Sequence, residues 1–345
     1  MLLFSLFKSQ TEDYLFYSFV SIILVYLVID LGFFNSKAHK ITTKSALYQS
    51  MLWVFISSVF GLLIYLFLPN GLDGWQFNPD GKGLDESVEY FSAYLTEYAL
   101  SVDNIFVILL ILKYFSVKDE YFHKILFWGI LGAVVFRGIF IFVGAYLIIK
   151  FHWILYIFGV FLIYSGIKIY FEDSDEKIDP EKNPILRLCR KYLPITKDEL
   201  GGKFMAKVDG KLMFTSLFLV AILVETTDLI FAVDSIPAAF AITEDPFLVY
   251  TSNIFAVMGL RAMFFLLAGI IDKFYLLQKG LSIILFFIGA KMLLEIFKND
   301  AGEPMFEISP ILSFAVIIAT LTLSIVFSVV IPQKEHPEET GTPGL

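Results

Sequence analysis

The stretch Val224-Glu-Thr-Thr-Asp-Leu-Ile-Phe-Ala-Val-Asp-Ser-Ile-Pro237 places three carboxylates inside an otherwise apolar segment that runs from residue 212 to residue 242. A charged side chain at the centre of a bilayer costs roughly 2.5 to 3.5 kcal/mol on the insertion scale. Three such charges in one membrane helix require a cation that offsets them. The stretch therefore predicts a membrane-spanning helix with a cation partner, and the rest of the chain must supply or bind that cation.

The composition of the whole chain supports a membrane environment. Of its 345 residues, 57% are hydrophobic and 17% are charged, and the mean hydropathy is +0.75. Soluble domains have about 25% charged and 45–50% apolar residues, so lipid is the expected solvent for most of this chain. One cysteine, Cys189, excludes a disulfide framework and a cysteine-based metal site. With a net charge of -8 and no basic patch or nucleic-acid motif, we expect no nucleic-acid partner.

Segments of about 20 apolar residues predict an all-α polytopic membrane protein with about nine transmembrane helices. The expected spans are residues 14–34, 46–68, 88–112, 122–149, 153–171, 212–242, 247–271, 274–297 and 308–331. Lys and Arg concentrate in the loops that face the cytoplasm if the N-terminus lies outside. The sequence therefore predicts a protein of the cell (inner) membrane with its N-terminus outside and its C-terminus in the cytoplasm.

Between the fifth and sixth spans, residues 172–211 are polar and predict a solvated cytoplasmic linker. Within it, residues 184–192 are a candidate for a short interfacial helix, with Leu186, Leu188 and Tyr192 toward lipid. Residues 1–87 are expected to hold two peripheral transmembrane helices, and residues 298–331 the ninth transmembrane helix. The tail 332–345 is rich in Pro, Glu and Gly and is expected to be disordered.

Residues 88–171 and 212–297 contain the same three elements in the same order. Glu97-Tyr-Ala-Leu-Ser-Val-Asp103-Asn104 aligns without gaps on Asp228-Leu-Ile-Phe-Ala-Val-Asp234-Ser235. The next span in each half carries an arginine, Arg137 or Arg261, and the span after that carries Gly-x-Lys, ending at Lys168 or Lys291. Each unit has three crossings, so the second copy must be inverted, as in many secondary transporters with sites at the repeat interface.

The candidate metal ligands in the two acidic spans are all oxygen donors. The predicted metal ligands are Glu97, Asp103, Asn104, Glu225, Asp228, Asp234 and Ser235. Oxygen ligands suit Mg²⁺, Ca²⁺ or Mn²⁺, whereas Zn²⁺ and Cu usually recruit imidazole or thiolate.

Charge balance and helix geometry complete the predicted site. Five carboxylates over-neutralise a divalent ion, so Arg137 and Arg261 are expected to offset part of the charge, or some carboxylates to be protonated. Pro237 lacks a backbone donor and is expected to kink or break the sixth span, freeing the carbonyl of Val233 as a further ligand.

The two acidic motifs and the segment Ser252-Asn-Ile-Phe-Ala-Val-Met-Gly-Leu-Arg-Ala262 resemble the signature sequences of the TerC family of integral membrane proteins. The resemblance covers residues 88–297, and the two preceding spans match the longer, Alx-like branch. It implies membership of the LysE-type transporter group, and export of manganese from the cytoplasm. It also implies a link to tellurite resistance, from which the family takes its name. On this basis we expect no enzyme and no covalent cofactor, with Mn²⁺ as the transported or bound ion.

Two other hypotheses remain open. An intramembrane aspartyl protease could use two membrane Asp residues, but neither Asp103 nor Asp234 follows the Gly-x-Gly stretch that usually accompanies that chemistry. A metal-binding scaffold in metal homeostasis or tellurite-type stress resistance would hand ions to partner proteins or recruit them. The expected partners are therefore a divalent metal ion and the lipid bilayer, with a homo-oligomer or stress-response proteins left open.

Overall fold

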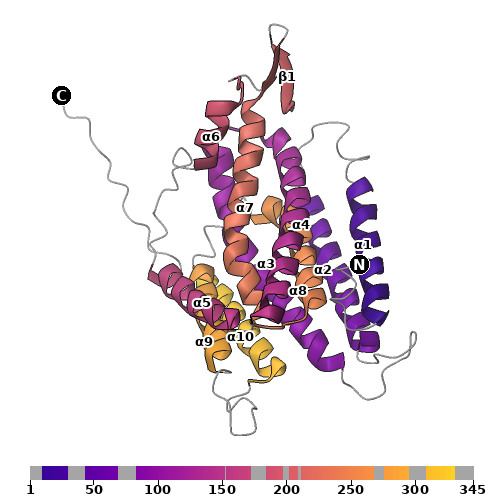
Figure 1. The fold of residues 1–345 in the computed structure, drawn as a ribbon. Helices are drawn as coiled ribbons and strands as arrows, with labels where there is room; N and C mark the ends of the chain where they lie inside the picture. Colours follow the sequence, from indigo (N-terminus) through magenta and orange to yellow (C-terminus); the bar gives the residue numbers. More distant parts are fainter. Residues whose placement is uncertain are drawn as a thin grey trace, which may run out of the picture.

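The computed structural model of the chain describes residues 10–29, 43–68, 83–151, 153–171, 184–196, 202–208, 211–267, 276–294 and 308–330. Within these residues it contains ten helices and one two-stranded hairpin (Figure 1). The helices are α1 (Gln10–Ile29), α2 (Thr43–Phe67), α3 (Gly83–Tyr114), α4 (Asp119–Lys150), α5 (Ile154–Phe171), α6 (Pro184–Tyr192), α7 (Ser216–Phe240), α8 (Pro246–Leu267), α9 (Leu277–Leu294) and α10 (Pro310–Val330). The strands are β1 (Met205–Val208) and β2 (Lys211–Phe214).

The all-α polytopic membrane fold predicted from the sequence is confirmed. Eight helices, all except α3 and α6, are long and apolar enough to cross a membrane. Helix α3 has 32 residues, more than the roughly 20 that a crossing needs, but it is not among these eight. The count of nine crossings therefore stays a prediction.

The region before α7 differs from its prediction in two ways. The sixth span was expected from residue 212, but α7 begins at Ser216 because residues 211–214 pair antiparallel with residues 205–208, with Met205 opposite Phe214. Residues 184–192 form α6, the short helix that the sequence offered as an alternative to a solvated linker. The expectation that Leu186 points toward lipid was wrong, since it is buried in the cluster that also contains Leu217. The tail 332–345 lies outside the described residues.

Two three-helix units, α3–α5 and α7–α9, run in opposite directions through the molecule. The first half of α7 packs on the second half of α3, the start of α4 and the end of α8. Its second half packs on Ala93 near the start of α3, the end of α4 and Val249 at the start of α8. Helices α3 and α7 are thus antiparallel, and so are α4 and α8. This is the arrangement that an inverted repeat predicts, and its placement across a bilayer stays a prediction.

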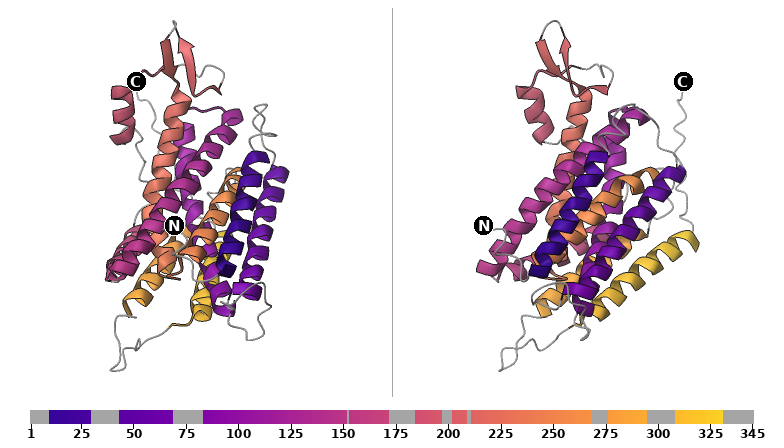
Figure 2. Two further views of the ribbon diagram at one scale, coloured as in Figure 1. Left: turned by 45° about the vertical axis from the view of Figure 1, so that its right-hand side comes forward. Right: turned by 90° about the vertical axis from the view of Figure 1, so that its right-hand side faces the viewer.

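Close approach of the third helices, α5 and α9, joins the two units at the end of the molecule opposite the hairpin (Figures 1 and 2). A Cβ atom added to Gly166 would lie 2.7 Å from the carbonyl oxygen of Ser282, and one added to Gly289 would lie 2.7 Å from that of Gly159. Real Cβ atoms do not come so near to backbone oxygens. Glycine at Gly166 and Gly289 is therefore what lets the two helix backbones touch.

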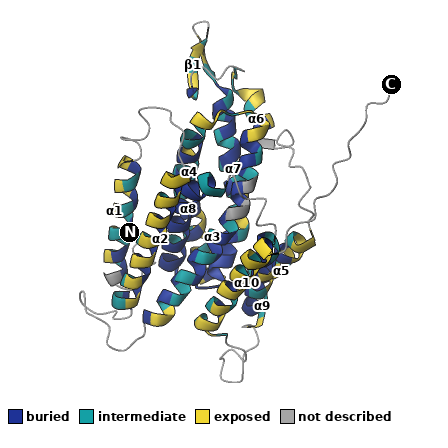
Figure 3. Ribbon diagram, turned by 180° about the vertical axis from the view of Figure 1, so that it is seen from behind, coloured by how far each residue is buried: buried dark blue, intermediate teal, exposed yellow. Residues whose placement is uncertain are grey.

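Helix α8 lies at the centre of the bundle, and the helices outside the two units cover it or border it. Helices α1 and α2 pack on α8, and α10 packs on α3 and α9. Large apolar side chains are exposed on the outer faces of α1, α2, α4, α5 and α10 (Figure 3). Exposed apolar faces of this extent are typical of helices that face lipid.

Candidate functional site

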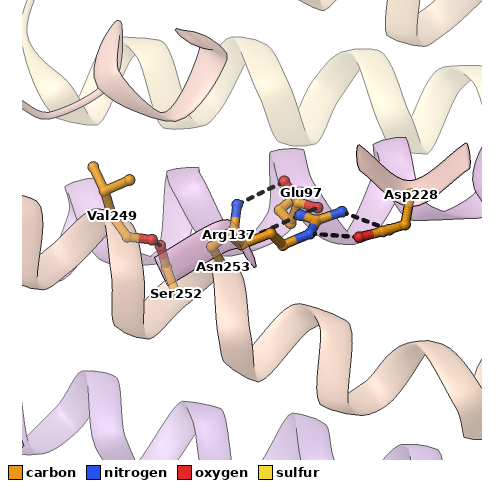
Figure 4. A network of polar contacts seen from close by, with 6 residues as sticks. All are labelled: Glu97, Arg137, Asp228, Val249, Ser252 and Asn253. Atoms are coloured by element: carbon orange, nitrogen blue, oxygen red, sulfur yellow. Dashed lines mark hydrogen bonds and ion pairs between the residues drawn. The ribbon is translucent and has the colours of Figure 1, made fainter. Parts of the chain in front are cut away.

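A fully buried guanidinium, that of Arg137 on α4, joins the two units at their interface (Figure 4). Its Nη1 donates to Glu97 Oε1 on α3 in an ion pair. Its Nε and Nη2 donate to the two carboxylate oxygens of Asp228 on α7, at 3.2 and 3.0 Å. One cation thus holds a carboxylate from each unit, and these are the two acids that the repeat alignment places at equivalent positions.

Asn253 on α8 completes this network. Its Oδ1 accepts from Arg137 Nη1 at 2.8 Å, and its Nδ2 donates to Glu97 Oε2 at 2.8 Å. Burying an ion pair costs desolvation energy, which is repaid only if the geometry is good and the remaining polar atoms are hydrogen-bonded. The bidentate contact with Asp228 and the two bonds of Asn253 meet that requirement, with one side chain from each of α3, α4, α7 and α8.

The network fixes the register of α3 against α7 and so separates the remaining motif residues. Because the helices are antiparallel, residues that follow Glu97 and Asp228 move toward opposite ends of the bundle. Asp234 lies six residues beyond Asp228, about 9 Å along the helix at 1.5 Å per residue. Asn104 lies seven residues beyond Glu97, about 10 Å in the other direction. The two copies of the motif therefore meet at Arg137, and their remaining polar residues lie toward opposite ends of the bundle.

Between the network and the hairpin end, three buried polar atoms have no hydrogen-bond partner among the described residues. They are Ser101 Oγ, Asn104 Nδ2 and Glu225 Oε1. The Glu225 carboxylate lies against the backbone of α4, because a Cβ added to Gly132 would collide with it. Buried polar groups are usually hydrogen-bonded, and an exception calls for an explanation such as a bound ion or water.

Toward the other end, Asp234 contacts the first unit. Its Oδ1 accepts a hydrogen bond from Ser165 Oγ on α5 at 3.0 Å. The Asp234 carboxylate also interacts electrostatically with the ammonium of Lys168. The Oγ of the neighbouring Ser235 is buried and has no partner among the described residues. Polar groups therefore continue on both sides of the Arg137 network.

Arg261, the second arginine of the repeat, has different surroundings from those of Arg137. It is also buried, and its Nη2 donates to the hydroxyl of Tyr26 on α1, whose ring lies 5.7 Å from the guanidinium carbon. The two arginines were expected to play the same charge-balancing part, but only Arg137 forms a salt bridge to Glu97 and Asp228 among the described contacts.

Helix α7 does not break at Pro237, so that part of the expectation was wrong, and a kink at Pro237 stays a prediction. The helix continues to Phe240, and the amide of Ala241 donates to the carbonyl of Pro237 at 2.9 Å. Because Pro237 lies in the last turn, its missing donor affects only one position near the helix end.

The predicted ligands therefore do not gather at one point. Glu97 and Asp228 meet at Arg137, Glu225, Asn104, Asp234 and Ser235 spread to either side, and the side chain of Asp103 lies outside the described residues. In the part of the chain that the structure describes, no group of three His, Cys, Asp or Glu side chains is placed to hold a metal ion. Asn253 and Ser165 were missed. Asn253 lies in the motif Ser252–Ala262 and could have been suspected, whereas nothing in the sequence distinguishes Ser165.

Comparison with known proteins adds family information. The model of the family described as "Integral membrane protein TerC family" matches residues 82–336. The "Uncharacterized membrane protein STKORF319" of Myxococcus xanthus is 40% identical over 337 residues, which cover 98% of each chain. The protein named "Putative membrane-bound redox modulator Alx" of Escherichia coli (strain K12) is 43% identical over 279 residues, covering 80% of this chain and 84% of that protein. No solved structure matches.

Proposed function

The chain belongs to the TerC family of integral membrane proteins, and from that premise we propose that it exports a divalent cation, preferably Mn²⁺, from the cytoplasm. The observation that carries the proposal is the Arg137 network, in which one buried cation holds Glu97 of the first unit and Asp228 of the second. The proposed mechanism is alternating access, with the two units moving against each other around this contact.

In this mechanism the guanidinium acts as a resident counter-ion for the two carboxylates. Movement of α7 relative to α3 and α4 separates Asp228 from Arg137 and exposes the carboxylates to a cation in the membrane interior. A divalent cation then takes the place of the guanidinium, and Arg137 returns when the ion leaves. The unpartnered polar atoms of Ser101, Asn104 and Ser235 would line its approach and exit.

Ligand chemistry supports a hard divalent cation. The network and the polar residues on either side of it offer carboxylate, hydroxyl and amide groups, and none is a histidine or cysteine. Such oxygen donors suit Mn²⁺, Mg²⁺ and Ca²⁺ better than the softer transition metals. The preference for Mn²⁺ rests on the resemblance to the family and is the part of the proposal that a competition assay tests.

Two other functions, a redox role and a metal-binding scaffold, can be distinguished from transport. A redox role appears in the name of the Escherichia coli relative, but a thiol–disulfide couple within one chain needs two cysteines, and this chain has only Cys189. A metal-binding scaffold would hold the ion without moving it across the bilayer. Binding without flux is therefore the outcome that favours the scaffold.

Manganese flux into proteoliposomes that contain the full chain tests the proposal directly. We expect Glu97→Gln and Asp228→Asn to abolish flux, because each removes a carboxylate that receives the ion. The matched control is Thr226→Val, on the same helix between Glu225 and Asp228, since the described hydrogen bond of its hydroxyl stays within α7, to the carbonyl of Ile222 at 2.7 Å. This control should transport normally.

Flux at the wild-type rate in both carboxamide variants would overturn the proposal. Manganese binding by the wild-type protein, measured by calorimetry and lost in the same variants, combined with no flux in any of them, would replace the exporter with the scaffold. Competition by Ca²⁺ and Mg²⁺ at equal concentration would show whether the preference for Mn²⁺ holds.

A further inference from the structure

The described residues of α6, the hairpin and the segments that adjoin them carry only positive charges. The described residues 184–196, 202–208 and 211–215 contain six basic residues and no acidic one, in a chain whose net charge is -8. All six are exposed: Arg187, Arg190, Lys191, Lys203, Lys207 and Lys211. We call this set of side chains the basic surface. It belongs to α6 and the hairpin, which stand together at one end of the bundle in every view (Figures 1 and 2).

Apolar side chains are exposed between these charges. Leu188 and Tyr192 of α6 are 56% and 70% exposed, and Met205 and Leu212 of the hairpin are 49% and 55% exposed. Leu212 is paired with Lys207 across the hairpin, so an apolar side chain and a basic side chain lie next to each other. Basic and apolar side chains in one exposed segment are typical of elements that lie at a membrane surface.

Aromatic residues pack against one another at the foot of the hairpin. The ring of Phe204 lies 6.2 Å from that of Trp128 on α4 and 6.4 Å from that of Phe218 on α7. Aromatic belts of this kind are typical of the membrane–water interface. Lys207 is three residues beyond Phe204, about 10 Å at 3.3 Å per strand residue. The basic surface thus lies beside these aromatic rings.

The basic surface is rigidly connected to the bundle. Lys124 of α4 donates to the carbonyl of Gly202 at 2.7 Å, and its ammonium lies 4.7 Å from the centre of the Phe204 ring. Thr215, directly before α7, donates to the carbonyl of Lys203 at 2.7 Å. Leu186 anchors α6 in the buried cluster beside α7. A ligand bound here would therefore restrain the position of α7.

We propose that α6 and the β1–β2 hairpin form a binding surface for the anionic headgroups of the surrounding phospholipids. Charge complementarity decides in favour of this occupant, because the charged side chains described in residues 184–196, 202–208 and 211–215 are all basic, lie beside aromatic rings and alternate with exposed apolar side chains. Anionic lipids of the adjacent leaflet attract such juxtamembrane segments. The inference is independent of the proposed metal export.

Lipid binding to the purified full chain tests this inference. Tryptophan emission, to which Trp128 contributes, is quenched by energy transfer when dansyl-labelled phosphatidylglycerol binds. Labelled phosphatidylcholine is the neutral comparison. We expect a clear preference for phosphatidylglycerol that weakens as salt is added, because the Debye length falls from about 10 Å at 0.1 M to about 3 Å at 1 M.

The double variant Lys207→Gln/Lys211→Gln should weaken phosphatidylglycerol binding by about 30-fold, since each lysine near an anionic surface is worth about fivefold. The matched control removes two lysines outside the basic surface, Lys150→Gln/Lys279→Gln, each of which contacts a tyrosine ring. This control should bind as the wild type does.

Equal binding of the two labelled lipids by the wild-type protein, or equal loss in both double variants, would overturn the inference. The salt series on the wild-type protein needs no variant, so it decides even if a variant folds poorly. A basic surface that fails to distinguish the lipids but binds an acidic peptide would also overturn it, in favour of a protein partner.

Discussion

The two three-helix units have matching motifs but unequal surroundings. In the first unit, Arg137 forms salt bridges to Glu97 and Asp228, the aligned acids of both units. In the second unit, Arg261 contacts Tyr26 of α1, a helix outside the repeat. Eight residues before each arginine, the second unit has Asn253 and the first has Gly129. One unit thus supplies the cation, and the other supplies the side chain that completes its hydrogen bonds.

This difference shows how a duplicated sequence becomes an asymmetric centre. Two equivalent arginines cannot both lie between the same two carboxylates, so one is placed elsewhere. The parts that remain equivalent are structural, above all Gly166 and Gly289 in the contact between α5 and α9. The comparison therefore predicts unequal effects for the arginines and equal effects for the glycines.

The largest expected effect distinguishes the two arginines. Arg137→Met leaves two buried carboxylates without their cation and should lower the free energy of unfolding by about 3–5 kcal/mol. Arg261→Met is the comparison, because the described contact of Arg261 is with the hydroxyl and ring of Tyr26 and not with Glu97 or Asp228, and we expect a different loss. Reversible unfolding in mixed detergent and SDS micelles measures both. Equal losses would mean that the two units are energetically equivalent.

Removal of the asparagine that has no counterpart in the first unit should have the next largest effect. Asn253→Ala takes away a donor to Glu97 and an acceptor from Arg137, and hydrogen bonds to charged groups are worth about 1.5–3 kcal/mol. The control is Ser252→Ala, whose hydroxyl bonds to Val249 of the same helix at 3.2 Å (Figure 4). The same unfolding assay should show a smaller loss for the control.

At the contact between α5 and α9, the two units should behave alike. Gly166→Ala and Gly289→Ala each push a Cβ against a backbone oxygen, and overpacking of this kind costs about 1–3 kcal/mol. Gly129→Ala in α4 is the control, because its Cβ would lie 3.5 Å from Val224, an ordinary contact. A loss at only one of the two glycines would disprove the equivalence.

The smallest effect is expected where the first unit contacts the second through a hydroxyl. Ser165→Ala removes the hydrogen bond to Asp234 and should cost about 1 kcal/mol, typical of one intramolecular hydrogen bond. Ser165→Thr keeps the hydroxyl and should recover most of the loss. The second unit has Ile288 at the aligned position, so this bond has no equivalent there.

Much of the fold could be predicted because it rests on local hydropathy. Runs of apolar residues located every described long helix to within a few residues, and the repeated motifs led to the opposite directions of the two units. The hairpin before α7 was missed because Leu212, Met213 and Phe214 continue the apolar run without a break. Hydropathy alone cannot distinguish a short amphipathic strand from the first turn of a membrane helix.

The candidate site was only partly predictable for a geometric reason. The sequence identified Glu97 and Asp228 as candidate ligands and Arg137 as a charge that offsets part of the carboxylates, and these three residues are neighbours. It did not indicate that their meeting point sets the register of two antiparallel helices and thereby separates Asp234 from Asn104. Register depends on contacts between distant segments, such as that of Asn253 with Glu97, which no local pattern specifies.

The burial of α8 has a consequence for how the protein is made. Within the protein, 94% of its apolar window is buried, and its mean hydropathy of 1.4 is the lowest among the eight candidate spans. A helix that touches so little lipid gains little from entering the bilayer alone. The ribosome delivers α1, α2, α3 and α4 first, and all four pack on α8. When α8 is synthesised, the four helices that surround it are therefore already present, and it can pack against protein instead of lipid. The order of synthesis thus matches the order of assembly.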